Sequence, residues 1–208
     1  MVMLPFRDKT PVRRAISTVV SRYGDHKPDL RIDFLQHCAY CHSYDEFVFT
    51  YFEVDHFVPK SFFLPLGTIT LTQYSNLVYS CKSCNNKKRD KWPSADETVY
   101  NDGTCGFVDP CTDEYATHFY RTSYGAIMWC TELGKWMHTT AFKFDEREKM
   151  LVLIYNLEKL EKSIHQITNL MEKMDLGSDD YQLVKGKRDH YLLTYFKFDC
   201  ERRKTIHY

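Results

Sequence analysis

Two Cys-x-x-Cys pairs, Cys38/Cys41 and Cys81/Cys84, constrain what this chain can fold into more than any other feature of its sequence. Each pair presents two sulfur ligands from one tight turn, which is the spacing found at zinc sites. Four thiolates complete the tetrahedral shell that zinc prefers and leave no position for water. We therefore expect a structural zinc ion that joins the two ends of this segment, the alternative being four unrelated core cysteines.

The remaining cysteines, Cys105, Cys111, Cys130 and Cys200, do not have this spacing. We expect them to be small buried thiols, and a second zinc site on Cys105 and Cys111 is the less favoured alternative. The first residues form too short an apolar run for a secretory signal, and the apolar run at residues 151–155 is far below membrane-spanning length. We therefore expect a soluble cytoplasmic protein with reduced thiols and no membrane partner.

The balance of charge limits how this chain can bind nucleic acid. Lys and Arg together number 28, as do Asp and Glu, so the formal net charge is zero. A phosphate-binding surface must therefore be local rather than global. Aromatic residues make up 15% of the chain, which is enough to fill a core and excludes wholesale disorder.

Hydrophobic patterning predicts an α+β protein. Residues 47–54 and 76–80 have the β-branched and aromatic character of strands, and a helical pattern follows from Cys84. Two further predicted strands, 116–122 and 126–131, form a β-hairpin. The chain is thereby divided into an N-terminal helical arm (1–30), a module with the zinc knuckles (31–92), a β-hairpin extension (93–140) and a helical hairpin (141–208).

The C-terminal part has the clearest helical periodicity. From Met150 to Met174, apolar residues recur at alternating steps of three and four, which predicts a heptad seam on one helix over 143–176. A turn at 176–180 separates it from a second predicted helix over 181–203. We favour two antiparallel helices packed on each other, and a dimerisation or partner-docking seam is the alternative.

Several polar residues between the cysteine pairs and directly after the second pair can carry chemistry. Asp55 offers the hard carboxylate oxygen that Mg²⁺ or Mn²⁺ prefers, and the neighbouring His56 can accept a proton near neutral pH. Adjacent residues on a strand point to opposite faces, so this pair requires a strand end or bend to converge. Asn76 and Asn85 carry amides that can clamp a loop or offer a neutral oxygen to a metal.

A cluster of basic residues follows the second cysteine pair. Lys87, Lys88, Arg89 and Lys91 all lie on the predicted helix, which ends before Pro93. They form a local positive patch beside the polar residues, as phosphate binding requires. The alternative is an ordinary solvated helix face.

Taken together, residues 35–92 resemble the HNH endonuclease family in its zinc-knuckle variant. The resemblance rests on Asp55-His56-x-x-Pro59, Asn76-Leu77 and Cys81-x-x-Cys84-Asn85-x-x-Lys88. It implies a ββα-metal fold, one catalytic divalent ion and hydrolysis of phosphodiester bonds in nucleic acid, with DNA as the expected substrate. The last metal-ligand position, often histidine in the family, is asparagine here.

The resemblance also implies a role for each matching residue. Asp55 and Asn85 would hold Mg²⁺ or Mn²⁺, His56 would deprotonate the attacking water, and Asn76 would orient the loop after His56. Asn86, adjacent to Asn85 and of the same type, is its competitor.

The downstream part is similar to HNH proteins encoded beside ATPases in prokaryotic anti-phage systems of the Septu kind. This similarity rests on residues 107–110, His118, Gly125-x-Ile127, Thr131-x-x-Gly134 and the long helix. It implies an ATPase partner docked on the helical hairpin, with a homo-oligomer as a further possibility. The competing interpretation of the whole chain is a zinc-stabilised nucleic-acid-binding or adaptor module without nuclease activity.

Overall fold

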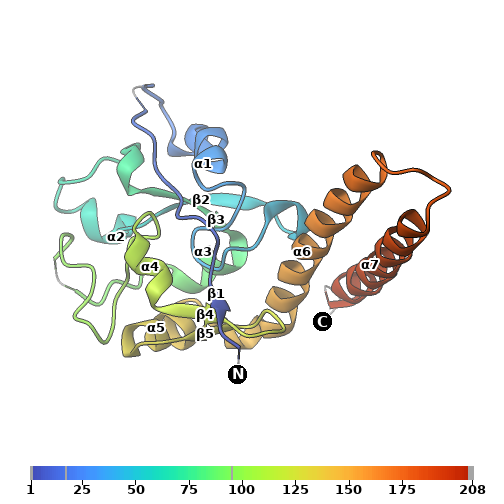
Figure 1. The fold of residues 1–208 in the computed structure, drawn as a ribbon. Coiled ribbons are helices and arrows are strands. Elements are labelled where there is room, and N and C mark those ends of the chain that lie inside the picture. The colour runs from blue at the N-terminus through green and yellow to red at the C-terminus, as the bar shows by residue number, and fades with distance from the viewer. Residues whose placement is uncertain (1, 17, 95, 206–208) are drawn as a thin grey trace.

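The chain between the first cysteine pair and the end of the second forms a short antiparallel sheet that is followed directly by a helix. Strand β2 (Phe52–His56) pairs with β3 (Leu77–Cys81), and α3 (Lys82–Lys88) begins immediately after β3. The register places His56 opposite Leu77 and Phe52 opposite Cys81. This computed structural model describes residues 2–16, 18–94 and 96–205, and its ββα unit confirms the predicted fold of this segment (Figure 1).

The elements around this unit are short. The first predicted strand lies further along the chain than expected, because residues 45–47 form a 3₁₀ turn and pairing begins only at Phe52. The loop between β2 and β3 contains α2 (Lys60–Phe63) and the 3₁₀ turn η3 (Tyr74–Asn76). Before the sheet lie η1 (Tyr23–His26), α1 (Lys27–Asp33) and η2 (Asp45–Phe47).

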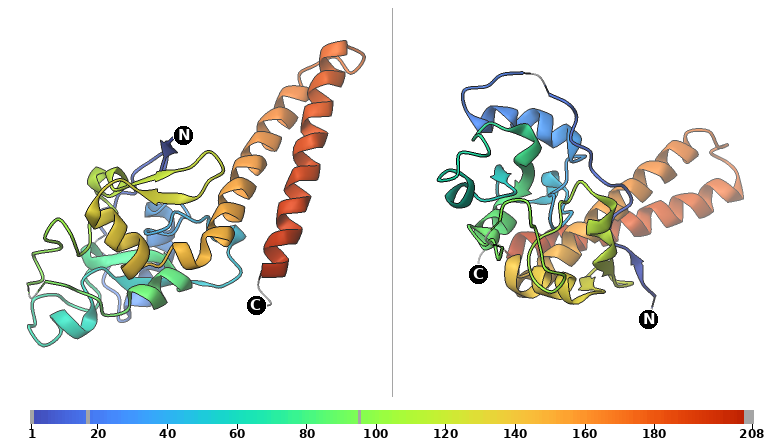
Figure 2. Two further views of the ribbon diagram at one scale, coloured as in Figure 1. Left: turned by 90° about the horizontal axis from the view of Figure 1, so that it is seen from below. Right: turned by 90° about the vertical axis from the view of Figure 1, so that its left-hand side faces the viewer.

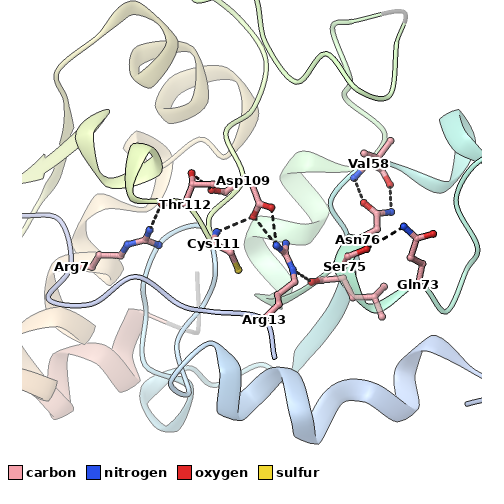
Figure 3. A network of polar contacts seen from close by, with 10 residues as sticks. Arg7, Arg13, Val58, Gln73, Ser75, Asn76, Asp109, Cys111 and Thr112 are labelled. Carbon is pink, nitrogen blue, oxygen red and sulfur yellow. Dashed lines mark hydrogen bonds and ion pairs between the residues drawn. The ribbon is translucent and has the colours of Figure 1, made fainter. Parts of the chain in front are cut away.

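The prediction of an N-terminal helical arm over residues 1–30 is wrong for most of this range. Residues 6–16 and 18–22 contain no helix and run across the body of the protein (Figure 1). The Arg13 guanidinium holds this segment, because it donates to the Leu77 carbonyl and to both Asp109 carboxylate oxygens at 2.8–2.9 Å (Figure 3). Pro28 lies in the first turn of α1, where its missing N–H costs nothing.

The β-hairpin is present but is no separate extension. Strands β4 (Phe119–Arg121) and β5 (Ile127–Trp129) form a three-stranded sheet with β1 (Leu4–Pro5) from the N-terminus. Phe119 and Ile127 belong to the same buried cluster as Leu77, so the expected division at residue 93 does not separate two cores. Around this sheet lie α4 (Asp113–Thr117), α5 (Glu132–Trp136) and a π-helical turn η4 (Met137–Ala141).

The predicted helical hairpin is confirmed. After the 3₁₀ turn η5 (Asp145–Arg147), α6 (Glu148–Met171) and α7 (Asp179–Lys204) run antiparallel and project from the body (Figure 2). The base is fastened to the body, because Leu157 and Ile154 pack on Phe47, and Arg202 donates to the Phe47 carbonyl at 2.9 Å. No helix among the described residues is both long and apolar enough to span a bilayer.

Candidate functional site

The four paired cysteines converge on one point. Their sulfur atoms all lie within 4.8 Å of one another, and every side chain is buried. The sulfurs of Cys41 and Cys81 are 3.8 Å apart, which is the edge of a tetrahedron whose zinc–sulfur distance is about 2.3 Å. The donor set and its spacing therefore fit a structural zinc ion with no open position.

The local backbone explains how these ligands are delivered. His42, directly after Cys41, has a φ of 55° and closes the first knuckle, with its N–H bonded to the Cys38 carbonyl at 2.9 Å. Cys81 ends β3 and is also the N-cap of α3, since its sulfur accepts the Cys84 N–H at 3.4 Å. The ββα unit and the zinc knuckles are thus built from the same residues.

The other cysteines do not join this site. Cys130 and Cys200 are exposed and Cys105 and Cys111 are half-buried, so the expectation of four small buried thiols is wrong. Within the described ranges, the four paired cysteines make up the only group of three or more Cys, His, Asp or Glu side chains with metal-binding spacing. The structure therefore provides no support for a second zinc on Cys105 and Cys111.

His56 ends β2 and faces away from α3. Its Nε2 lies 2.9 Å from the Leu71 carbonyl, so Nε2 carries the proton and Nδ1 the lone pair. The Tyr23 ring packs edge-on against the imidazole, with 4.7 Å between ring centroids. Burial lowers the pKa of His56, while the Leu71 carbonyl and Asp55 act in the opposite direction. The ring is therefore neutral at pH 7 and has a free basic nitrogen.

Asn76 fixes the loop that follows His56. Its side-chain oxygen accepts the Val58 N–H at 2.8 Å, and its side-chain nitrogen donates to the Val58 carbonyl at 3.1 Å (Figure 3). Its own carbonyl accepts the Phe57 N–H at 2.8 Å. Three hydrogen bonds from one buried asparagine thus hold the two residues after His56, which is the geometry that the expected orienting role requires.

Asp55 points to the opposite face of β2 and into the core. The Tyr40 hydroxyl donates to its carboxylate at 2.7 Å, and the Lys88 ammonium lies 3.2 Å from the same oxygen. Lys88 also donates to the His56 carbonyl at 2.8 Å, and its side chain is 0% exposed. Lys88 therefore cannot belong to a surface patch, and the phosphate contact expected of it is excluded by burial.

Asn85 has a partner outside the residues predicted for the site. Its side-chain nitrogen donates to a Glu53 carboxylate oxygen at 2.6 Å. Glu53 and Asp55 are two positions apart on β2 and therefore share the face toward α3, where they meet Asn85 and Lys88 respectively. The period of two along β2 is the sequence signal that could have identified Glu53. Asn86, the competitor of Asn85, is exposed.

The donor chemistry on this face suits a hard divalent cation. Two carboxylates, Glu53 and Asp55, and the amide of Asn85 offer the oxygen ligands that Mg²⁺ and Mn²⁺ prefer. Asp55 is shared with the Lys88 ammonium, so a cation there would compete with a buried positive charge. Glu53 and Asn85 carry no such competitor among their hydrogen-bonded partners in the described chain.

The remaining basic residues are closer to the surface. Lys87 forms an ion pair with Glu146 at 2.5 Å, and the Lys91 ammonium is bonded to the Lys87 carbonyl. Arg89 is exposed, and its Nε donates to the Asn86 carbonyl at 3.1 Å. Of the expected patch, Arg89 is thus the most exposed residue. Lys87 and Lys91 are half-buried, and their ammonium groups already have partners within the protein.

Comparison with known proteins gives one match. Residues 38–91 fit the sequence model of the family described as HNH endonuclease. Neither a curated protein nor a solved structure matches the chain significantly. The matched segment begins at the first zinc ligand and ends just after α3, so it contains both cysteine pairs, His56 and Asn76.

Proposed function

We propose that this chain, whose residues 38–91 are an HNH endonuclease domain, is a metal-dependent nuclease that hydrolyses phosphodiester bonds in DNA. The family implies a hydrolase acting on nucleic acid. The observation that carries the proposal is the arrangement of His56 at the end of β2. Its tautomer is set by the Leu71 carbonyl, and its loop is held by Asn76.

In this mechanism His56 is the general base. Its Nδ1 accepts a proton from the attacking water, and the positive ring that results is stabilised by the hydrogen bond from Nε2 to the Leu71 carbonyl. Asn76 keeps the loop in place, so the imidazole does not change orientation as it gains charge. The Tyr23 ring lies against this imidazole, so the Tyr23 side chain must move aside, or leave Nδ1 accessible, when the substrate binds.

The face of β2 toward α3 would hold the catalytic ion. Asp55 and Asn85 are the ligands that the family pattern assigns, and Glu53 is the carboxylate bonded to Asn85 in this fold. A bound Mg²⁺ or Mn²⁺ supplies positive charge that stabilises the transition state and the departing oxygen. Exposed Arg89, with Lys87 and Lys91, would contact the phosphate backbone beside this face.

Two further elements of the proposal concern partners. Helix α7 carries exposed apolar side chains, among them Leu183, Leu193 and Phe196, which suit a protein contact. An ATPase of an anti-phage defence complex, or a second copy of this chain, would dock there. The competing function, a zinc-stabilised binding or adaptor module, requires neither a base with a fixed tautomer nor oxygen ligands on the face of β2 toward α3.

The deciding experiment compares His56→Ala with the parent chain on plasmid DNA in Mg²⁺ or Mn²⁺. We expect the variant to keep its zinc and its circular dichroism but to lose cleavage, by about 100-fold or more. Zinc content is measured on the same samples, so loss of the fold is distinguished from loss of the base. A variant that is folded and cuts as well as the parent would refute the assignment of His56.

A further inference from the structure

Most of the zinc-site sulfurs have a hydrogen-bond partner within the HNH domain. The Cys38 sulfur accepts the Cys81 N–H at 3.3 Å, and the Cys81 sulfur accepts the Cys84 N–H. The Cys41 sulfur lies 3.2 Å from the Ser43 hydroxyl. Such outer contacts orient metal ligands and tune their affinity for the metal.

Cys84 obtains its partner from outside the domain. The Nη2 atom of Arg147 lies 2.7 Å from the Cys84 sulfur, and Nη1 lies 3.7 Å from the Cys81 sulfur. Arg147 is 63 residues further along the chain and directly precedes α6. Its guanidinium also lies over the Phe144 ring, 5.5 Å from the centroid, so its position is fixed by packing on the body.

The charge of the site explains why a cation belongs there. Four thiolates around Zn²⁺ carry two net negative charges, and all four side chains are at most 2% exposed. A buried charge without a partner is costly, whereas a guanidinium provides a permanent positive charge and several donors in one plane. A second buried guanidinium, that of Arg121, donates to the Cys41 carbonyl at 3.2 Å.

We propose that Arg147 is an outer-sphere residue of the zinc site that slows the loss of zinc and fastens the start of the helical hairpin to the HNH domain. The contact adds a fastening point at the start of the hairpin, since the same residue precedes α6 and bonds to a ligand from α3. Zinc occupancy and the placement of the hairpin are thereby coupled. This inference rests on the zinc site and not on nuclease activity.

The test measures zinc release from the full chain into an excess of a coloured chelator. Arg147→Gln should release zinc about 10- to 100-fold faster than the parent, in line with the loss of metal affinity that follows removal of an outer-sphere partner. Arg147→Lys keeps the charge but cannot reach two sulfurs at once, so its rate should fall between the two. Arg188→Gln is the matched control, because among the described residues Arg188 bonds only to its neighbour Asp189 on α7.

A second readout locates the effect. Alkylation of the folded, zinc-loaded protein, followed by mass spectrometry, should show Cys84 reacting earlier than Cys38 in Arg147→Lys. Release rates within about twofold of the parent in both variants, with unchanged circular dichroism, would overturn the proposal. If Arg147→Gln does not fold, Arg147→Lys and the order of alkylation decide, and equal protection of Cys84 and Cys38 counts against it.

Discussion

Lys88 and Asp55 form a buried ion pair, with 3.2 Å between the ammonium nitrogen and the carboxylate and no exposed surface on the lysine side chain. The pair connects α3 to β2 at the residue before His56. It makes one residue of the expected phosphate-binding patch into part of the core. It also gives Asp55 a structural partner in addition to the metal-binding role that the family pattern assigns to it.

Replacing Lys88 should therefore destabilise the fold. Lys88→Met leaves the Asp55 carboxylate buried with the Tyr40 hydroxyl as its remaining side-chain partner in the described part of the chain, and breaking a buried pair in this way costs about 3–5 kcal/mol. Urea denaturation measures the change in the free energy of unfolding. Lys87→Met serves as the surface control and should change it by about 0.5 kcal/mol or less. Equal stability of the two variants would mean that the pair is not formed in solution.

Glu53 should contribute to binding of the divalent ion. Its carboxylate is bonded to Asn85 and is free of the Lys88 charge that faces Asp55. Titration with Mn²⁺, followed by the electron paramagnetic resonance signal of free Mn²⁺, should show about tenfold weaker binding for Glu53→Gln. Glu172→Gln, at the far end of α6, is the control. If Mn²⁺ affinity is unchanged in Glu53→Gln but lower in Asp55→Asn, then Asp55 is a ligand of the ion and Glu53 is not.

His138 should make the fold sensitive to mild acid. It is buried, its Nε2 donates to the Ile127 carbonyl at 2.9 Å, and its Nδ1 has no partner among the described residues. Burial lowers the pKa of His138 below its usual 6.5. As the pH falls below 6.5 the unfolded chain takes up a proton that the folded chain resists, so stability is present above this pH and decreases below it.

His138→Gln keeps an N–H donor near the same place but does not titrate. Between about pH 7 and about pH 5.5 the parent should lose about 1 kcal/mol more stability than this variant. Thermal unfolding at both pH values, on zinc-loaded samples, measures the difference. Parallel losses in the two proteins would assign the acid sensitivity to other groups.

Two substitutions on the helical hairpin should separate packing from partner binding. Leu157 is 0% exposed and packs on Phe47, so Leu157→Asp should unfold or severely destabilise the protein, by about 3 kcal/mol or more. Phe196 is 60% exposed, so Phe196→Asp should leave the fold intact. If α7 contacts a second copy, Phe196→Asp should lower the mass measured by light scattering, whereas a parent that is already monomeric excludes the homo-oligomer.

The sequence by itself determined the parts of this protein that depend on short spacings. Two Cys-x-x-Cys pairs specify four ligands, and the strand and helix periods predict the ββα unit and the C-terminal hairpin. Each of these signals is local, because it depends on residues that are only a few positions apart in the sequence. The tertiary structure decided what depends on contacts between distant segments. Arg13 holds the N-terminal segment extended through Asp109, 96 residues away, which no local propensity could indicate.

The same distinction runs through the site. His56 and Asn76 could be identified from their order in the chain, but the Leu71 carbonyl that sets the tautomer is recognised only in three dimensions. The basic run at the end of α3 predicts one surface patch, yet α3 turns Lys88 into the core, while Arg89, directly after the helix, is exposed. Partners such as Arg147 for Cys84 come from packing and charge compensation in the folded state, and composition and spacing do not contain that information.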